Sequence, residues 1–490
     1  MACEAAHYPA VNFIEDVLEG FPASGRAVIA IDRHGDRQVW HFGELIARSA
    51  GLSGAFAARG IGRGDVVMTL VGTRIEWVLA MLACFRMGAV ALPCSTQLRR
   101  RDLEHRVRAA SPDLALGEEE LLNELPDVVP VMTIADVHGA LDEDRRQAPP
   151  VAPADLQPED PALIVFTSGT TGAPRGVVHA QRYLTEQSLQ AENWFGSRQG
   201  ELAWCTTASG WSKSARNVFI APWLTGATAL IHDGRFDPAE RLELVEREGV
   251  NVLCQAPTEY RILAQRGELR PIPSLRRMVA AGERLGPEIA AQVRERMGLP
   301  VHDGYGQTET GHLTGTGPDT EARDGSMGRA LPGVELRVTD RGLELRRQSC
   351  PTFFSRYLDG ESFQDEWWPT GDHVRVDGDG YLWHEGRGDD VIVSSGYRIG
   401  PEEVESALTS HPAVAEAAAV AAPDTERGAV VRAIVVLREG EPGPELARQL
   451  QDHVKDVTAP YKFPRIVEFA EALPRTPSGK LRRAALREGS

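Results

Sequence analysis

The stretch Asp65–Leu92, DVVMTLVGTRIEWVLAMLACFRMGAVAL, predicts the fold of this 490-residue chain. An apolar run at residues 65–70 is followed by an amphipathic helix-like segment at residues 75–86 and a second apolar run at residues 89–92. Strand, helix and strand in this order indicate a βαβ unit, in which the two strands lie parallel. The pattern recurs at residues 227–255 and 277–297, so we expect a large domain of α/β layers.

The sequence pattern changes after Gly325. Short alternating apolar runs at residues 334–338, 343–346 and 373–376, separated by glycine-rich turns, are typical of a small antiparallel β subdomain. A further strand and helix pattern begins at Val391, with a helix expected at residues 401–410 and a strand at residues 430–437. We therefore expect two domains: an N-terminal α/β domain at residues 1–386, and a small, mobile α+β domain at residues 387–490.

Composition excludes several classes of function. A net charge of −17 argues against broad binding to nucleic acids or anionic membranes, which need a basic face. The six cysteines are scattered singly, so neither a disulfide framework nor a structural zinc site is expected. No targeting segment and no apolar run near the roughly 18 residues of a membrane span is found. These features predict a cytoplasmic protein with small-molecule ligands.

A loop rich in glycine and hydroxyl groups, FTSGTTGAPRG, occupies residues 166–176 directly after the apolar run at residues 162–166. Glycine lets backbone N–H groups approach an anion closely, and the Ser and Thr hydroxyls can donate to phosphate oxygens. Arg175 adds a fixed positive charge. The spacing differs from the G-x-x-x-x-G-K-[ST] phosphate loop, and a Gly/Thr-rich turn between strands is the alternative interpretation.

Four further segments carry chemistry of the same kind. They are DGYGQTETG at residues 303–311, WPTGD at residues 368–372, EGRGDDVIVSSGYRIGPEEVE at residues 385–405 and PRTPSGK at residues 474–480. Tyr305 offers a flat face to a purine, Thr308 a hydroxyl to a phosphoryl oxygen and Glu309 a hard oxygen ligand to Mg²⁺. Each segment taken singly is also compatible with an ordinary polar turn.

Together and in this order, the five segments resemble the adenylate-forming superfamily, which contains acyl-CoA synthetases, adenylation domains of peptide synthetases and luciferases. The resemblance extends from about Asn12 to Arg487. Within the superfamily the chain looks most like medium-chain acyl-CoA synthetases, on the residues at 210–211, 222–224, 305–310 and 459–465.

The resemblance implies a reaction in two halves with ATP, Mg²⁺ and coenzyme A. A carboxylate attacks the α-phosphate of ATP to give acyl-adenylate and pyrophosphate, and the thiol of CoA then attacks the mixed anhydride. The C-terminal domain of the family rotates between the two halves, about a hinge that by motif position falls on Asp389. Lys480 would neutralise charge in the adenylation transition state, with Thr308 and Glu309 acting on the α-phosphate and Mg²⁺.

The resemblance also implies the binding residues. ATP would contact Thr167, Ser168, Gly169, Thr170, Thr171, Gly172, Arg175, Asp303, Gly304, Tyr305, Gly306, Gln307, Thr308, Asp372, Arg387 and Lys480. CoA would contact Ser395, Gly396, Tyr397, Arg398, Arg427, Lys455 and Arg465, with Gln97 as a further candidate. The acyl pocket would be lined by Trp211, Phe219, Gly282 and Gly306. Exposed Arg and Lys residues are usually only solvated, and Trp211 could equally be a core aromatic.

The pocket residues favour a medium-chain or aryl acid, because acetyl-specific relatives carry a tryptophan where this chain has Gly306. Three interpretations remain at this point: an acid:CoA ligase, a stand-alone adenylating enzyme that passes the acyl group to a carrier protein or an amine, and a non-catalytic nucleotide-binding protein. One departure from the family pattern is Arg175, where a lysine is usual. Arginine keeps the charge but adds a planar, bidentate head.

Overall fold

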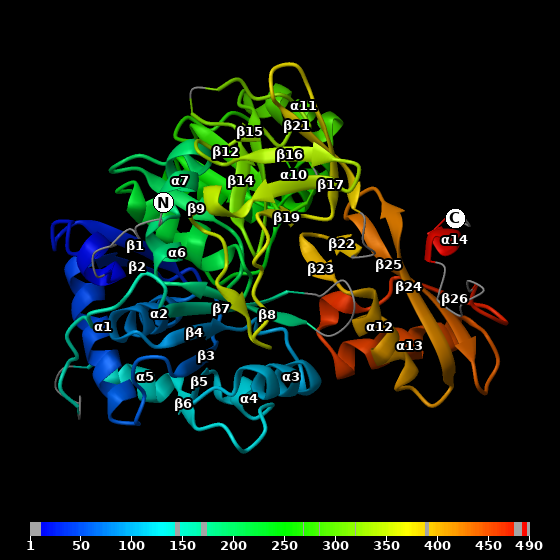
Figure 1. Ribbon diagram of the computed structural model, residues 1–490, viewed down its shortest axis with the longest axis horizontal. Coiled ribbons are helices and arrows are strands. Elements are labelled where there is room, and N and C mark those ends of the chain that lie inside the picture. Colours follow the sequence, from blue (N-terminus) through cyan, green and yellow to red (C-terminus); the bar gives the residue numbers. More distant parts are fainter. Residues whose placement is uncertain are drawn as a thin grey trace.

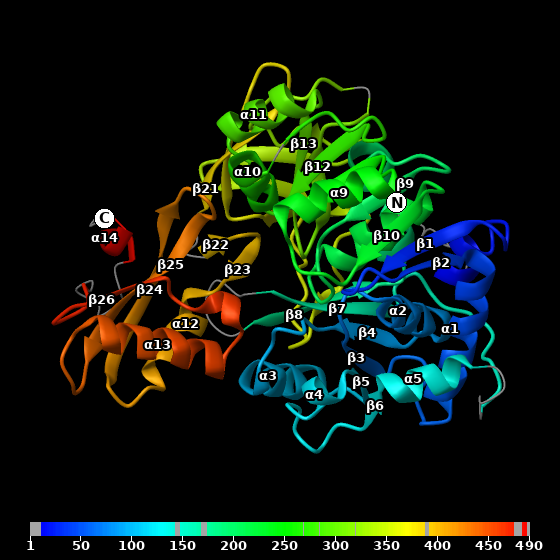
Figure 2. The same ribbon diagram turned by 180° about the vertical axis from the view of Figure 1, so that it is seen from behind.

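The computed structural model describes residues 11–142, 148–167, 174–267, 269–283, 285–318, 320–387, 392–474 and 483–487. Two large sheets and their helices form the N-terminal part, and a smaller group of elements lies beside them (Figures 1 and 2). No helix in the described part of the chain is long and apolar enough to cross a membrane. The predicted fold class, α/β with a large N-terminal and a small C-terminal region, is confirmed.

The first sheet has the strand order β15-β14-β13-β12-β11-β9-β10-β1-β2. Neighbouring strands from β13 to β1 are parallel, whereas β2, β14 and β15 pair antiparallel at the edges. The strands are β1 (Arg26–Ile31), β2 (Arg37–His41), β9 (Leu202–Cys205), β10 (Thr228–His232), β11 (Val252–Gln255), β12 (Arg277–Ala281), β13 (Val301–Gln307), β14 (Gly311–Gly315) and β15 (Arg329–Ala330). The runs of Val, Ile, Met and Ala in the parallel strands β1 and β12 are continuous because helices cover both faces of a parallel sheet.

The second sheet has the order β18-β8-β7-β4-β3-β5-β6 and contains the βαβ unit predicted at residues 65–92. Parallel pairing of Val66 with Val90 joins β3 to β4, and α2 (Ile75–Met87) connects them, so this prediction is confirmed. The strands are β3 (Val66–Leu70), β4 (Val90–Pro93), β5 (Leu114–Gly117), β6 (Val131–Thr133), β7 (Pro161–Thr167), β8 (Arg175–Ala180) and β18 (Arg356–Tyr357).

Helices form three layers around the two sheets. The layer between the sheets shares one apolar core with Val28 and Ala229 of the first sheet and Val67 and Ala91 of the second. Its elements are η1 (Ile14–Leu18), α1 (Phe42–Ala57), α2, α5 (Ile134–Leu141), α6 (Arg182–Thr185), α7 (Ser188–Gln190), η2 (Ala191–Phe195), η3 (Arg216–Ile220) and α8 (Ala221–Leu224). The outer layers are α9 (Pro238–Glu248), α10 (Pro257–Arg266) and α11 (Pro287–Met297) on the first sheet, and α3 (Arg100–Ala110) and α4 (Glu119–Leu122) on the second.

Short antiparallel strands follow, as the sequence predicts. They are β16 (Leu336–Thr339), β17 (Gly342–Arg346) and β19 (Trp367–Pro369) in one sheet, the ribbon β20 (Asp372–Val376) and β21 (Leu382–Arg387), and the single turn η4 (Arg347–Ser349) between them. The ribbon carries Asp372 at the first position of β20.

The elements after residue 391 have an apolar core of their own, built around Val404, Val431 and Val454. They are β22 (Ile392–Ser394), β23 (Tyr397–Ile399), α12 (Pro401–Thr409), β24 (Val414–Asp424), β25 (Gly428–Leu437), α13 (Pro444–Val457), η5 (Pro460–Lys462), β26 (Ile466–Phe469) and α14 (Arg483–Arg487). The helix predicted at residues 401–410 and the strand predicted at residues 430–437 are both present. The exact domain boundary at residues 386 and 387 stays a prediction.

Candidate active site

Two cavities lie at the carboxyl ends of β12 and β13, the edge at which parallel α/β sheets bind ligands. The Trp211 cavity, of about 910 Å³, is lined by Trp211, Lys213, Arg216 and Tyr397 among others. The Asp372 cavity, of about 770 Å³, is lined by Asp372, Tyr305, Glu283 and His384 among others. Gly282, Gly306 and Gln307 line both, so the two cavities meet at these residues.

Several hydrogen bonds hold Asp372 in its cavity. Its carboxylate accepts hydrogen bonds from the Tyr305 hydroxyl at 2.6 Å and from Gln307 Nε2 at 3.0 Å, and His384 Nε2 lies 3.3 Å away. The side chain is only 3% exposed. The fold thus brings together two segments that the sequence analysis singled out separately, at residues 303–311 and 368–372. His384 belongs to neither segment and was missed by sequence reasoning.

Asp303 is the third residue of β13 and precedes Gly304, which lines the Asp372 cavity. Its side chain is 4% exposed, and its Oδ1 accepts a hydrogen bond from the backbone N–H of Gly304 at 2.9 Å. Burial raises the pKa of Asp303 to about 8. Gly304 is required at the next position, because a Cβ there would lie 2.5 Å from His312 Nε2 and 2.6 Å from Trp194 Nε1.

The ends of the predicted phosphate loop are fixed by strand pairing, with Thr167 of β7 opposite Arg175 of β8. Residues Ser168, Gly169, Thr170, Thr171 and Gly172 lie outside the described residues. The Arg175 guanidinium pairs with Asp359 at 2.8 Å and with Glu361 at 2.6 Å. It also stacks on the Tyr357 ring, with 3.6 Å between its central carbon and the ring centroid.

Glu309 is connected to Arg175 through that tyrosine. The Tyr357 hydroxyl donates a hydrogen bond to Glu309 Oε1 at 3.2 Å. Thr308, 5% exposed, lines the Trp211 cavity next to it. Among the residues that the structure describes there is no group of three or more His, Cys, Asp or Glu side chains that could hold a metal ion. A half-buried single carboxylate fits Mg²⁺ only together with substrate phosphates, which is how this ion is usually held at nucleotide sites.

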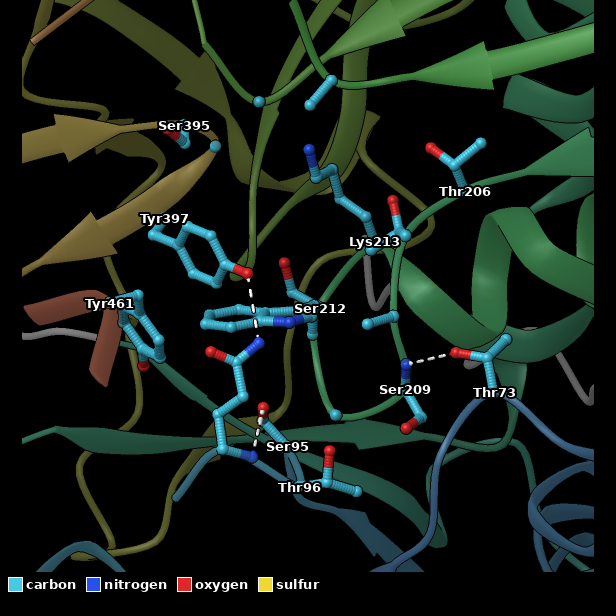
Figure 3. Close-up of a pocket in the computed structure, with 18 of the residues that line it drawn as sticks. Thr73, Ser95, Thr96, Thr206, Ser209, Ser212, Lys213, Ser395, Tyr397 and Tyr461 are labelled. Atoms are coloured by element: carbon cyan, nitrogen blue, oxygen red, sulfur yellow. Dashed lines mark hydrogen bonds between the residues drawn. The ribbon is translucent and has the colours of Figure 1, made fainter. Parts of the chain in front are cut away.

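An aromatic cluster closes the Trp211 cavity toward the C-terminal elements. The ring centroid of Trp211 lies 4.7 Å from that of Tyr397 and 5.2 Å from that of Tyr461, and the two tyrosines stack at 4.3 Å. Gln97 Nε2 donates to the Tyr397 hydroxyl at 3.3 Å (Figure 3). Figure 3 places Tyr397 and Tyr461 on the side of the cavity opposite Thr73 and Thr206, with Lys213 between them.

Several residues predicted to bind CoA line this cavity. Ser395, Gly396, Tyr397 and Arg427 all do so, and Arg427 Nη1 donates to Ser395 Oγ at 2.9 Å. Gly396 has φ +79°, and a Cβ there would lie 3.1 Å from Glu283 Oε1, so a side chain would narrow the cavity. Lys455 instead pairs with Asp452, and neither it nor Arg465 lines the cavity. The side chain of Arg398 lies outside the described residues.

Of the four residues predicted to line the acyl pocket, three line the Trp211 cavity and one lies in the core. Trp211, Gly282 and Gly306 line the Trp211 cavity. Phe219 is fully buried in the layer between the sheets, where its ring centroid lies 5.3 Å from that of Trp77 and 4.9 Å from that of Trp223. It therefore packs in the core. A Cβ on Gly282 would lie 2.2 Å from Lys213 Nζ, which donates to the carbonyl of Ala281 at 2.6 Å.

A buried ion pair joins the N-terminal part to the C-terminal elements. Lys462 of η5, 3% exposed, lies 2.8 Å from Asp102 of α3 and 3.2 Å from Glu403 of α12. Burial alone would lower the pKa of Lys462, but the Glu403 and Asp102 carboxylates raise it overall. The Thr458 hydroxyl also donates to Asp102, at 2.8 Å. The contact therefore fixes the present arrangement of the two parts.

Three predicted residues cannot be placed in detail. Lys480 and Asp389 lie outside the described residues. Arg387 is described by its backbone only, which pairs with that of Asp372 across the β20–β21 ribbon. The structure conversely adds cavity residues that sequence reasoning missed, namely Lys213, Arg216, Glu283 and His384. The two cations could have been noticed, since they interrupt an otherwise weakly polar segment after Trp211.

Comparison with known proteins identifies the family. The AMP-binding enzyme family matches residues 15–350, and the AMP-binding enzyme C-terminal domain matches residues 403–480. The chain is 36% identical over 503 residues to the uncharacterized acyl-CoA ligase YtcI of Bacillus subtilis, covering 96% of this chain and 94% of that protein. It is 34% identical over 522 residues to the mitochondrial acyl-coenzyme A synthetase ACSM3 of Mus musculus, covering 97% and 90%. The resemblance to acyl-CoA synthetases of the medium-chain type is confirmed.

Three solved structures resemble the fold over almost the whole chain. The o-succinylbenzoate CoA synthetase MenE of Bacillus subtilis, bound to a CoA product analogue, is 27% identical with a TM-score of 0.84, covering 98% of each chain. The amide bond synthetase McbA of Marinactinospora thermotolerans is 25% identical with a TM-score of 0.83, covering 98% of this chain and 99% of that one. ATP-bound MatB of Rhodopseudomonas palustris is 26% identical with a TM-score of 0.70, covering 98% and 99%.

Proposed function

Because this chain belongs to the family of AMP-binding enzymes, we propose that it is an ATP-dependent carboxylic acid:CoA ligase. It joins an acid to CoA through an acyl-adenylate and releases AMP and pyrophosphate. The observation that carries the proposal is the meeting of the two cavities at Gly282, Gly306 and Gln307. One cavity suits a nucleoside, the other suits an acyl group and a thiol, and the reacting atoms would meet where the two join.

The Asp372 cavity is assigned to ATP. A buried carboxylate that already accepts hydrogen bonds from Tyr305 and Gln307 is held in one orientation, as recognition of the two ribose hydroxyls requires. Thr308 lines the Trp211 cavity directly after Gln307, and its hydroxyl would donate to the α-phosphate. Glu309 is the proposed ligand of Mg²⁺, which when bound would neutralise phosphate charge. The loop at residues 167–175 would hold the β- and γ-phosphates.

The Trp211 cavity is assigned to the acyl group and to the pantetheine arm of CoA. Gly396 leaves a narrow passage between the C-terminal elements and Glu283, and Arg427 supplies positive charge at the same passage. The described arrangement fits the thioester-forming half of the reaction. In support, the TM-score to MenE with its CoA product analogue is 0.84, against 0.70 for ATP-bound MatB, at nearly equal identity.

The adenylation half would need a different arrangement of the C-terminal elements. By motif position, Lys480 would then bridge the incoming carboxylate and the α-phosphate, and Asp389 would be the hinge. Arg387, beside Asp372 in the β20–β21 ribbon, would assist ribose binding. These assignments follow from the sequence motifs, and Lys480→Ala tests that of the catalytic lysine.

A variant that fills the space between Gly396 and Glu283, through which the pantetheine arm would pass, tests the proposed CoA ligase function. Gly396→Leu should abolish acyl-CoA formation while acid-dependent exchange of pyrophosphate into ATP continues, because only the thiol path is filled. Gly440→Leu is the matched control: Gly440 also has positive φ, at +92°, but its nearest non-local atom is 4.0 Å from the Cβ position. Equal thioester formation by the two variants would contradict the assignment of the passage to CoA.

The second candidate is a ligase that transfers the acyl group to an amine, and the fold similarity to the amide bond synthetase McbA favours it. The two candidates differ in the products formed from one incubation with acid, ATP, CoA and a mixture of amines. Mass spectrometry should detect the acyl-CoA. Release of AMP with amide but without thioester would favour the second candidate.

A further inference from the structure

The Trp211 cavity contains a buried guanidinium, that of Arg216, for which the described part of the chain provides no ion-pair partner. Arg216 is the first residue of η3, is 3% exposed and lines the cavity. Its Nε and Nη1 atoms are buried without a hydrogen-bond partner, and no ion pair among the described residues involves it. A buried charge without a partner costs several kcal/mol in general, so such groups are usually paired or bind a ligand.

No carboxylate among the described residues forms an ion pair with Arg216. His312, which lines the same cavity, and His179 are the titratable groups that face it. Burial, together with the nearby charges of Arg216 and Arg182, lowers the pKa of His179 to about 3. Burial and Arg216 also lower the pKa of His312, so both imidazoles are neutral near pH 7. Lys213, three residues earlier, adds a second cation whose hydrogen bond goes to a backbone carbonyl.

Two other buried cations of the cavity, Arg241 and Lys462, have carboxylate partners, whereas Arg216 has none among the described residues. Arg241 lies 3.1 Å from Glu259 Oε1 and donates to Gln255 Oε1 at 2.6 Å. Lys462 lies between two carboxylates. The unpaired charge of Arg216 therefore lies at one end of the cavity, where η3 and β14 meet.

The position of Arg216 separates it from the nucleotide. It lines the Trp211 cavity and is not among the residues that line the Asp372 cavity. Its Nη1 lies 3.8 Å from the position that a Cβ of Gly311 would occupy, at the start of β14. On β14 the next residue, His312, pairs with Gly306, where the two cavities meet. A π-helical turn starts at Arg216, and such turns are frequent at functional sites.

We propose that Arg216 binds a second anionic group at the distal end of the acid, so that the substrate is a dicarboxylic acid or a similarly dianionic medium-chain or aryl acid. One carboxylate reacts with ATP and then with CoA, and the other pairs with the guanidinium and leaves the reaction unchanged. The products are the mono-CoA thioester, AMP and pyrophosphate. This inference rests on the proposed ligase function and names its substrate class.

Matched pairs of acids test the proposal on the wild-type enzyme. Hexanoate is compared with adipate, and benzoate with terephthalate, by the rate of AMP release in the presence of ATP and CoA. We expect kcat/KM to be at least ~10²-fold higher for the dianionic acid of at least one pair, because a site built to pair a polar group rejects the analogue that lacks it. Preference for the monoanionic acid in both pairs would overturn the proposal. No AMP release with any of the four acids would instead count against the ligase function itself.

Substitution then assigns the preference to Arg216. Arg216→Met keeps the length of the side chain and removes its charge, so it should lose ~10²-fold or more on the dianionic acid and keep or gain activity on the monoanionic acid. Arg432→Met is the control: Arg432 is buried and paired with Glu468 at 2.6 Å but lines neither cavity, so its loss should leave the ratio of the two acids unchanged. A uniform loss on all acids with a raised KM for ATP would place Arg216 at the reacting carboxylate or a phosphate, and would overturn the proposal. If Arg216→Met does not fold, the wild-type ratios decide alone.

Discussion

Neutralising Asp102 is expected to slow thioester formation selectively. Asp102 is the partner that the N-terminal part contributes to the buried Lys462 contact, at 2.8 Å. Asp102→Asn keeps the side-chain shape and a hydrogen-bond acceptor but leaves Lys462 with Glu403 alone. A buried hydrogen bond to a charged group contributes about 1.5 to 3 kcal/mol. Loss of about 2 kcal/mol from this arrangement corresponds to a shift of about 30-fold in its population relative to the adenylating one.

The assay separates the two halves of the reaction. Thioester formation is followed in a single turnover from preformed acyl-adenylate and CoA, and adenylation by acid-dependent pyrophosphate exchange. Asp102→Asn should slow the first by up to about 30-fold and leave the second unchanged or faster.

The matched control is Asp136→Asn. Asp102 and Asp136 occupy the same third helical position and accept a hydrogen bond from the backbone N–H of the N-cap residue, Arg99 and Thr133 respectively, but Asp136 is exposed and far from the C-terminal elements. Any effect of weakened helix capping should therefore appear in both variants. An equal loss in both half-reactions, or an equal effect of the control, would refute the reasoning.

Three further predictions concern residues of the proposed nucleotide site. Arg175→Ala should raise the KM for ATP more than it lowers kcat, because the end of the phosphate loop is then no longer held by Asp359 and Glu361. Arg175→Lys should keep adenylation. An unchanged KM for ATP in steady-state kinetics of Arg175→Ala would count against this prediction. Lys480→Ala should bind ATP normally by calorimetry yet lose adenylation by orders of magnitude, and unchanged pyrophosphate exchange would refute its role. Burial raises the pKa of Asp303 to about 8. Between about pH 4 and pH 8 the folded chain therefore holds a proton that the unfolded chain has released. The free energy of unfolding then falls by about 1.4 kcal/mol for each unit by which the pH rises. Asp303→Asn should remove this decline, so the gain in Tm over wild type should grow from about pH 5 to about pH 8, and a constant difference would contradict the buried acid.

The layered fold could be predicted from sequence because its signals are local. The strands at residues 66–70 and 90–93 are buried on both faces, so their apolar runs are continuous. The segment between them is recognised as a helix because its apolar residues follow the helical spacing. The short strands after Gly325 alternate because one face is exposed and polar, as in β20, where Val374 is buried between the exposed His373 and Arg375. Pairing partners such as β13 and β14 depend on contacts that no local pattern encodes.

The candidate site could be predicted where a motif carries the chemistry. Tyr305, Gln307 and Asp372 come from two such motifs, and they meet as expected. Phe219 was predicted to line the acyl pocket but packs in the core between Trp77 and Trp223. Sequence alone does not distinguish an aromatic residue that lines a cavity from one that is buried in the core. The role proposed for Arg216 could not be predicted from sequence. It depends on the three-dimensional surroundings, in which the buried Nε and Nη1 atoms have no hydrogen-bond partner among the described residues.

Transfer of oxygen from the acid to AMP tests the central claim most directly. An acid whose carboxylate carries ¹⁸O is incubated with the enzyme, ATP and CoA, and the AMP is analysed by mass spectrometry. Attack of the carboxylate on the α-phosphate, followed by attack of the thiol on the acyl carbon, leaves one carboxylate oxygen on AMP. The account predicts one ¹⁸O per AMP together with an equal amount of acyl-CoA. Unlabelled AMP, or formation of ADP and phosphate in its place, would contradict the acyl-adenylate.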